Sequence, residues 1–119
     1  MNSFSAIPGD AAGTVQLTAD AAAPASIVSR ALLTTAEARV TFFSFAAGQE
    51  LTAHTNARRA LVQILSGACD FFYAGEWQRL AAGTLLHLPP HHPHAVRASE
   101  PFTMLLTLCG EPIPASSSS

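Results

Sequence analysis

The feature that most constrains the fold is a series of short apolar runs separated by regularly spaced glycines. Gly67, Gly75 and Gly83 stand eight residues apart, which is the spacing of tight turns between successive short strands. The runs are rich in aromatic and branched side chains and span residues 28–33, 39–45, 61–65, 68–73, 77–80, 85–88, 95–98 and 102–108. Eight or more short strands without a convincing helix predict an all-β fold, either a sandwich or a closed barrel.

Size and composition indicate a single folded unit. The chain has 119 residues, of which 49% are hydrophobic and 12% charged, so it can bury a core but has few surface charges. We expect an N-terminal arm over residues 1–25, a β-barrel over residues 26–110 and a disordered tail over residues 111–119. The arm contains one strand candidate, Val15 to Thr18, and the tail ends in four serines.

Charge and hydropathy exclude several classes of protein. The net charge is −2, and the chain has no lysine and no basic cluster, so nucleic acid is not an expected partner. No apolar run approaches the ~20 residues of a membrane helix, and the N-terminus lacks the pattern of a secretion signal. Cys69 and Cys109 are too few for a disulfide framework. We therefore expect a soluble cytoplasmic protein with two reduced cysteines.

The residues most able to carry chemistry are the histidines. His54 lies far upstream of the other four, which stand at positions 87, 91, 92 and 94. Strands distant in sequence can be neighbours in a sheet, so His54 and His94 can meet. Three prolines between positions 89 and 93 stiffen the loop that delivers His94. Alternation along a strand predicts that His54 and Asn56 point to the same face.

Two spaced patterns around these histidines resemble the motifs of the small single-domain cupins. The first places the family's glycine, histidine pair, acidic position and second glycine at Gly48, His54, Asn56, Ala60 and Gly67. The second motif of the family has a glycine, a proline, a second glycine, a histidine and an asparagine. The matching positions here are Gly83, Pro89, His91, His94 and Ala98, so the spacing is kept although His91 and Ala98 differ from the family's residues. The stretch between the motifs, residues 68–82, is near the family minimum, and the resemblance covers about residues 28–109. It implies a double-stranded β-helix, the jelly-roll barrel of the RmlC-like cupins.

The resemblance also implies a metal site that this sequence keeps only in part. Metal-binding cupins hold the ion with two histidines and a glutamate of the first motif and one histidine of the second. Here the matching residues are His54, Asn56, Ala60 and His94. Asparagine offers a neutral amide oxygen and alanine offers no ligand, so a divalent ion (Fe, Ni, Mn or Zn) on His54, His94 and Asn56 should bind weakly. The alternative is a metal-free pocket in which the two imidazoles hydrogen-bond a ligand or water.

Four further residues are candidates for the wall of the pocket: Gln63, Arg59, His92 and Met104. Gln63 stands three positions after the vacant acidic position, so only a bulge would turn it to the same face. Arg59 and its neighbour Arg58 can bind a carboxylate or phosphate, although such a pair more often lies in a solvated turn. His92 can complete a metal site, and Met104 more often fills a core than lines a pocket.

Two classes of function stay open at this point. In the first, the chain is a small bacterial-type cupin of unassigned activity that binds a small organic ligand inside the barrel, with or without a divalent metal. An enzyme of this kind would be a metal-dependent dioxygenase or isomerase, or a metal-free isomerase that uses His54 or His94 as base. In the second, it is a metal-free ligand sensor. The resemblance implies a homodimer, and sheet edges and a sparsely charged surface favour self-association.

Overall fold

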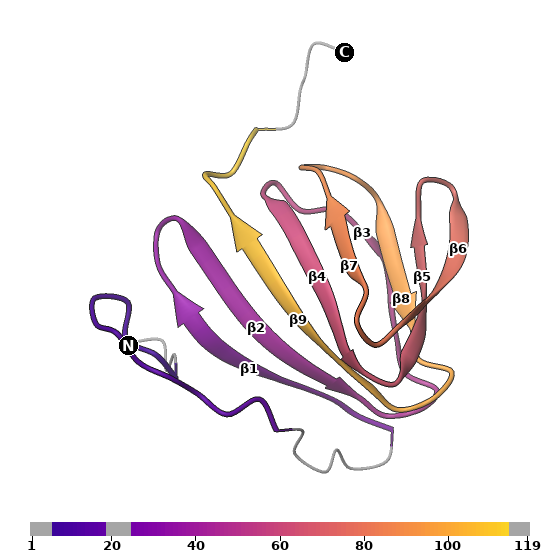
Figure 1. The fold of residues 1–119 in the computed structure, drawn as a ribbon. Helices are drawn as coiled ribbons and strands as arrows, with labels where there is room; N and C mark the ends of the chain where they lie inside the picture. The colour runs from indigo at the N-terminus through magenta and orange to yellow at the C-terminus, as the bar shows by residue number, and fades with distance from the viewer. Residues whose placement is uncertain (1–5, 19–24, 115–119) are drawn as a thin grey trace.

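The computed structural model describes residues 6–18 and 25–114 and confirms the all-β prediction (Figure 1). Its nine strands are β1 (Ile27–Thr34), β2 (Ala38–Phe45), β3 (Glu50–His54), β4 (Arg59–Ser66), β5 (Ala68–Tyr73), β6 (Glu76–Ala81), β7 (Leu85–Leu88), β8 (His94–Arg97) and β9 (Phe102–Cys109). The described ranges contain no helix long and apolar enough to cross a membrane. Each predicted run coincides with most of one strand.

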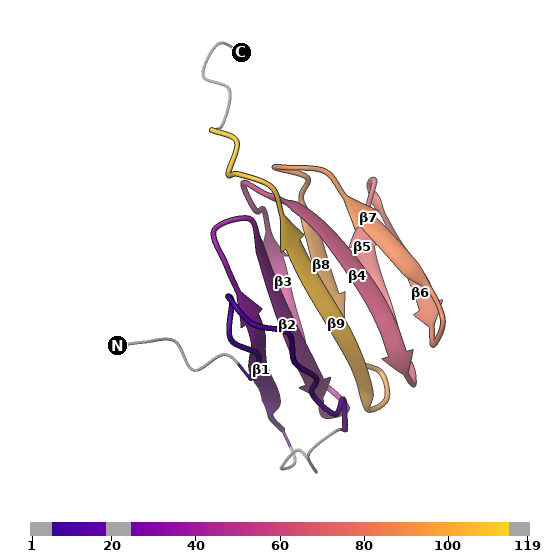
Figure 2. The same ribbon diagram turned by 60° about the vertical axis from the view of Figure 1, so that its left-hand side comes forward.

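The strands form two antiparallel sheets that face each other (Figures 1 and 2). One sheet has the order β1-β2-β9-β4-β7, and the other has the order β3-β8-β5-β6. Several neighbours are far apart in the chain: β9 lies between β2 and β4, and β8 lies between β3 and β5. The chain therefore passes repeatedly from one sheet to the other, as in a double-stranded β-helix.

The glycines that predicted the turns stand between consecutive strands, after β4, β5 and β6. Gly75 has a φ of 83°, which suits the tight turn between β5 and β6. Gly67 has a φ of 72°, and a Cβ atom at this position would overlap the Pro101 carbonyl oxygen. Only glycine allows this close approach between the β4–β5 turn and the chain entering β9.

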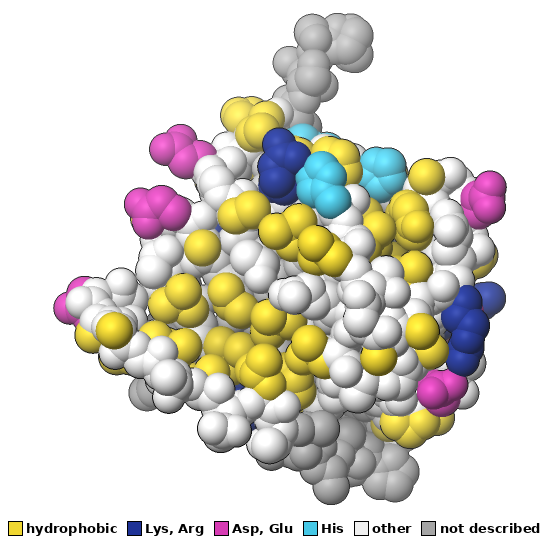
Figure 3. Space-filling view, viewed as in Figure 1, with side chains coloured by type: hydrophobic (Ala, Val, Ile, Leu, Met, Phe, Trp, Pro, Cys, Tyr) yellow, Lys and Arg dark blue, Asp and Glu magenta, His cyan; other side chains and the backbone are white. Residues whose placement is uncertain are grey.

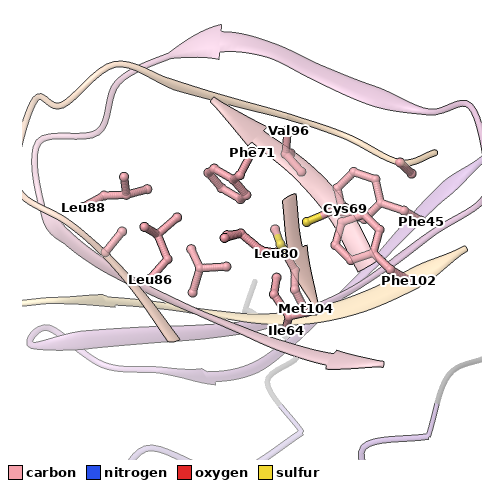
Figure 4. Packing of buried hydrophobic residues seen from close by; sticks show 13 residues of the cluster. Phe45, Ile64, Cys69, Phe71, Leu80, Leu86, Leu88, Val96, Phe102 and Met104 are labelled. Carbon is pink, nitrogen blue, oxygen red and sulfur yellow. The ribbon is translucent and has the colours of Figure 1, made fainter. Parts of the chain in front are cut away.

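The hydrophobic core lies between the two sheets (Figure 4). Alternation along each strand turns every second side chain inward, so β4 contributes Val62 and Ile64. Phe45 and Phe102 stack with ring centroids 4.6 Å apart. Met104, a candidate pocket residue, is 3% exposed and belongs to this core. These core side chains occupy the space between the two sheets.

The described segments before β1 and after β9 pack on the barrel without forming strands. Residues 6–18 contain no strand, so the candidate at Val15 to Thr18 is wrong. This segment instead lies beside β1, where the backbone N–H groups of Ala6 and Ile7 donate to carbonyls of that strand. At the other end, the N–H of Ile113 donates to the carbonyl of Ala57. The remainder of the predicted arm and tail, residues 1–5, 19–24 and 115–119, lies outside the described residues.

One strand was missing from the predicted runs. Glu50–His54 forms β3, which pairs with β8. The strand ends at His54, so Asn56 lies in the loop that leads to β4. The expectation that strand alternation puts His54 and Asn56 on one face is therefore wrong, because the strand does not continue far enough.

Candidate functional site

One end of the barrel collects the histidines, and we call it the histidine end: His54, His87, His91, His92 and His94. It lies at the top in Figure 1, where β3 and β7 end and where β4 and β8 begin. Arg58 and Arg59 belong to the same end, since they precede and begin β4. Figure 3 shows histidine and arginine side chains next to each other along this edge of the molecule.

The structure brings His54 and His94 together as cross-strand neighbours on β3 and β8. Their ring centroids are 4.2 Å apart and their planes are inclined by 60°. A shift in register produces this contact: with Leu51 opposite Val96, a regular ladder would put Ala53 opposite His94, whereas the irregularity before His54 puts the histidine there. We call these two side chains the imidazole pair.

Each imidazole is held through its Nδ1 atom. Nδ1 of His54 lies 2.8 Å from the carbonyl oxygen of Thr52, and Nδ1 of His94 lies 2.8 Å from that of His92. Because a carbonyl oxygen only accepts, a neutral ring in this position carries its proton on Nδ1 and a lone pair on Nε2. The imidazole pair therefore presents two Nε2 acceptors.

The two rings differ in burial. His54 is exposed, whereas His94 is 8% exposed and has the ring of Phe71 at 6.2 Å between centroids. Burial lowers the pKa of His94; the bond to the His92 carbonyl opposes this shift, and the proximity of His54 and His92 adds to it. The lowered pKa favours the neutral form of His94, which keeps its Nε2 an acceptor.

The surrounding residues do not complete a site for a divalent metal. Ala60 is buried and has no donor atom, and Oδ1 of Asn56 accepts the N–H of Arg58 at 2.9 Å. Within residues 6–18 and 25–114, no three His, Cys, Asp or Glu side chains are placed to hold one ion. Two neutral imidazoles leave the charge of a divalent ion uncompensated, so this donor set does not fit a resident metal.

The other candidate pocket residues either lie away from the imidazole pair or use their side chain in a hydrogen bond to the backbone. Gln63 is exposed on the outer face of β4, because the strand alternates regularly there. Arg59 is also exposed, and its Nη1 donates to Nε2 of His87 at 2.7 Å. Nε2 of His92 accepts the N–H of Ala74 at 3.2 Å, which ties the loop before β8 to the β5–β6 turn. Gln63 and Arg59 therefore face solvent outside the barrel.

Two hollows of similar size lie elsewhere on the surface, and neither has His54 or His94 in its wall. One is on the outer face of the four-stranded sheet and is lined by Glu50, Thr52, Ala53, Phe72, Trp77 and Ala95. The other is at the histidine end and includes Arg39 and Arg58. Sequence reasoning missed Arg39, although a signal was present: it shares the inward alternation of Phe43 and Phe45 along β2.

Comparisons with known proteins agree on the fold. The family model described as "Cupin domain" matches residues 41–108. Among curated proteins, none matches the sequence. The chain is similar to the structure of a cupin superfamily protein from Desulfitobacterium hafniense DCB-2, with a TM-score of 0.72, 24% identity, and coverage of 76% of this chain and 83% of that one.

Two further solved structures are similar. A conserved protein of unknown function from Streptococcus pyogenes has a TM-score of 0.69 and 28% identity, with 90% of this chain and 100% of that chain covered. A cupin 2 conserved barrel domain protein from Leptotrichia buccalis has a TM-score of 0.67 and 34% identity, with 71% of this chain and 41% of that chain covered.

Proposed function

Because this chain belongs to the cupin family, we propose that it binds a small organic ligand at the histidine end, with His54 and His94 as its polar anchors. The observation that carries the proposal is the contact between the two rings, whose centroids are 4.2 Å apart on adjacent strands. Cupin folds host many activities, so the family alone does not name the ligand. The chemistry of the imidazole pair does indicate which class of ligand can bind.

Two Nε2 acceptors on rings in contact favour a ligand that offers two hydrogen-bond donors, such as a molecule with neighbouring hydroxyl groups. The bonds from Nδ1 to Thr52 and His92 orient the rings before any ligand arrives, which lowers the entropy lost on binding. The neutral His94 can also take a proton from a bound molecule, which is the chemistry of a metal-free isomerase. A ligand sensor needs only the binding step.

Metal-dependent chemistry, as in a dioxygenase or isomerase, is the second candidate. One observation favours it: metal-binding histidines in proteins commonly donate their other ring N–H to a backbone carbonyl, as His54 and His94 do. The missing third ligand counts against it, since Ala60 stands in the core and Asn56 caps a turn. Iron, nickel, manganese and zinc are the ions to be tested.

The proposal is tested on tag-free protein by metal analysis and by NMR of the histidine ring nitrogens. We expect substoichiometric metal, and a hydroxylated small molecule that shifts the Nε2 signals of both His54 and His94. His54→Ala should abolish this response. His87→Ala is the matched control, because His87 lies on the outer face in contact with Arg59 and should leave binding unchanged.

Two results would contradict ligand binding at the imidazole pair. One is stoichiometric metal that disappears in His54→Ala, which would instead support the second candidate. The other is a set of hydroxylated compounds none of which moves the His54 or His94 signals, or which all bind His54→Ala as well as wild type.

We further propose a homodimer that uses the outer face of the five-stranded sheet. Leu85 is 62% exposed and Leu65 36% exposed there, and Figure 3 shows hydrophobic side chains gathered on this face. Covering such a patch with a second copy removes apolar surface from water. Sedimentation equilibrium should give twice the chain mass of 12.4 kDa, and a single-chain mass at micromolar concentration would contradict the dimer.

A further inference from the structure

We propose that the hollow beside Arg39 and Arg58 is a binding site for a small organic carboxylate, separate from the imidazole pair. Neither His54 nor His94 lines it. The test of this site and the test of the imidazole pair can therefore fail independently.

The hollow has a volume of about 300 Å³ and is walled by four parts of the chain. The end of β1 and the turn after it contribute two threonines, β2 contributes Arg39, the β3–β4 loop contributes Arg58, and β9 and the segment after it complete the wall. The lining residues are Thr34, Thr35, Arg39, Asn56, Ala57, Arg58, Leu108 and Pro112. Residues far apart in the sequence thus form one concave surface at the histidine end.

The two arginines bring positive charge that the described part of the chain does not balance. In the described ranges the guanidinium group of Arg39 makes no hydrogen bond or ion pair, and that of Arg58 makes only one contact, from Nη2 to the carbonyl oxygen of Ala36 at 3.4 Å. Two carboxylates stand close in sequence to lining residues, Glu37 near Arg39 and Glu111 next to Pro112, but they line no part of the hollow and pair with neither arginine. Both guanidinium groups are thus available to an anion.

The remaining wall fits the rest of a small organic acid. A guanidinium group offers parallel N–H donors that match the two oxygens of a carboxylate. The hydroxyl of Thr34 adds a donor, whereas that of Thr35 is engaged with Ala38. Leu108 and Pro112 provide apolar surface for a short hydrocarbon part. This mixture of charge and apolar wall favours an organic carboxylate over inorganic phosphate, which has no apolar part to bury.

The test uses benzoate as probe and isothermal titration calorimetry at low ionic strength on the full chain. We expect saturable benzoate binding that weakens as salt is added. Arg39→Gln and Arg58→Gln should each weaken it about tenfold, because each removes a charge-assisted hydrogen bond. Arg59→Gln is the matched control: it is adjacent to Arg58 but points to the outer face, where it contacts His87, and should bind benzoate as wild type does.

Three results would overturn the site: no saturable binding of benzoate, an equal loss in Arg59→Gln, or tighter binding of inorganic phosphate than of benzoate. Circular dichroism and thermal melting show whether each variant is folded, and Arg39 is exposed, so its substitution should not disturb the core. His54→Ala should bind benzoate normally. If it does not, the anion occupies the imidazole pair and the two sites are not separate.

Discussion

The two ends of the barrel differ in whether their charged side chains form ion pairs. At the end opposite the histidines, which we call the paired end (Asp70, Arg79, Arg97 and Glu100), Asp70 lies 4.0 Å from Arg79 and 3.6 Å from Arg97. Arg79 also reaches Glu100 at 2.8 Å. At the histidine end, Arg39 and Arg58 make no such pair in the described ranges. Arginines paired with carboxylates of the same chain contribute to the fold, whereas arginines without such a partner are available to a ligand.

The same contrast extends to the backbone and the cysteines. Near the paired end, Gly67 is pressed against Pro101, whereas Gly75 in the β5–β6 turn at the histidine end has open space around it. Cys69, at the start of β5, is fully buried, and Cys109, at the end of β9, is half-buried. The barrel is therefore tightly packed around Gly67 and Cys69.

The largest expected difference between the ends is in thiol reactivity. Burial, and secondarily the charge of Asp70, raises the pKa of Cys69 to about 12, although Arg79 lowers it in part. Because only the thiolate reacts, an upward shift of this size slows labelling about 10³-fold. A disulfide reagent should label one thiol per native chain and both in denaturant. Fast labelling that persists in Cys109→Ser would show that the paired end is open.

Glycine substitutions probe the packing of the two ends. Gly67→Ala should cost about 3 kcal/mol of unfolding free energy, since it combines a left-handed backbone with a steric overlap against Pro101. Gly75→Ala meets nothing and should cost only the backbone term, about 1 kcal/mol. Urea unfolding measures both. Equal costs would mean that the contact at Gly67 relaxes freely.

Removing a charge at each end tests the role of ion pairs. Asp70→Asn should lower the unfolding free energy by about 0.5–1 kcal/mol, because it removes both of the carboxylate's arginine partners at a partly exposed site. Arg39→Gln should change it by less than about 0.5 kcal/mol. The Asp70 effect should shrink in added salt. If Arg39→Gln destabilised the fold as strongly, its charge would have a partner in the protein.

The smallest expected effect is the pH dependence contributed by His94. Its folded-state pKa is lowered, mainly by burial, so below its ordinary value of about 6.5 the unfolded chain binds a proton that the folded chain does not. The unfolding free energy should therefore fall as the pH drops below this value. In His94→Gln the fall should be shallower, with His87→Gln as control. An unchanged slope in His94→Gln would place the titration elsewhere.

Much of the fold was predictable because its signals are local. The runs of aromatic and branched residues and the turn glycines at 67, 75 and 83 depend on conformational preferences within a few residues. The two spaced motifs around His54 and His94 predicted the family, which the match over residues 41–108 confirms. The short strand β3 was missed as a run because Glu50–His54 is largely exposed and lacks an apolar pattern.

The sequence by itself determined the strand pattern and the turns, since these follow from side-chain alternation and turn chemistry nearby in the chain. It also singled out His54 and His94, through the spacing of the two motifs. The tertiary structure decided which residues meet. The register shift that puts His54 opposite His94 and the hollow around Arg39 both depend on pairing between distant segments. A slip of one residue reverses the face of every side chain, and no local pattern records such a slip.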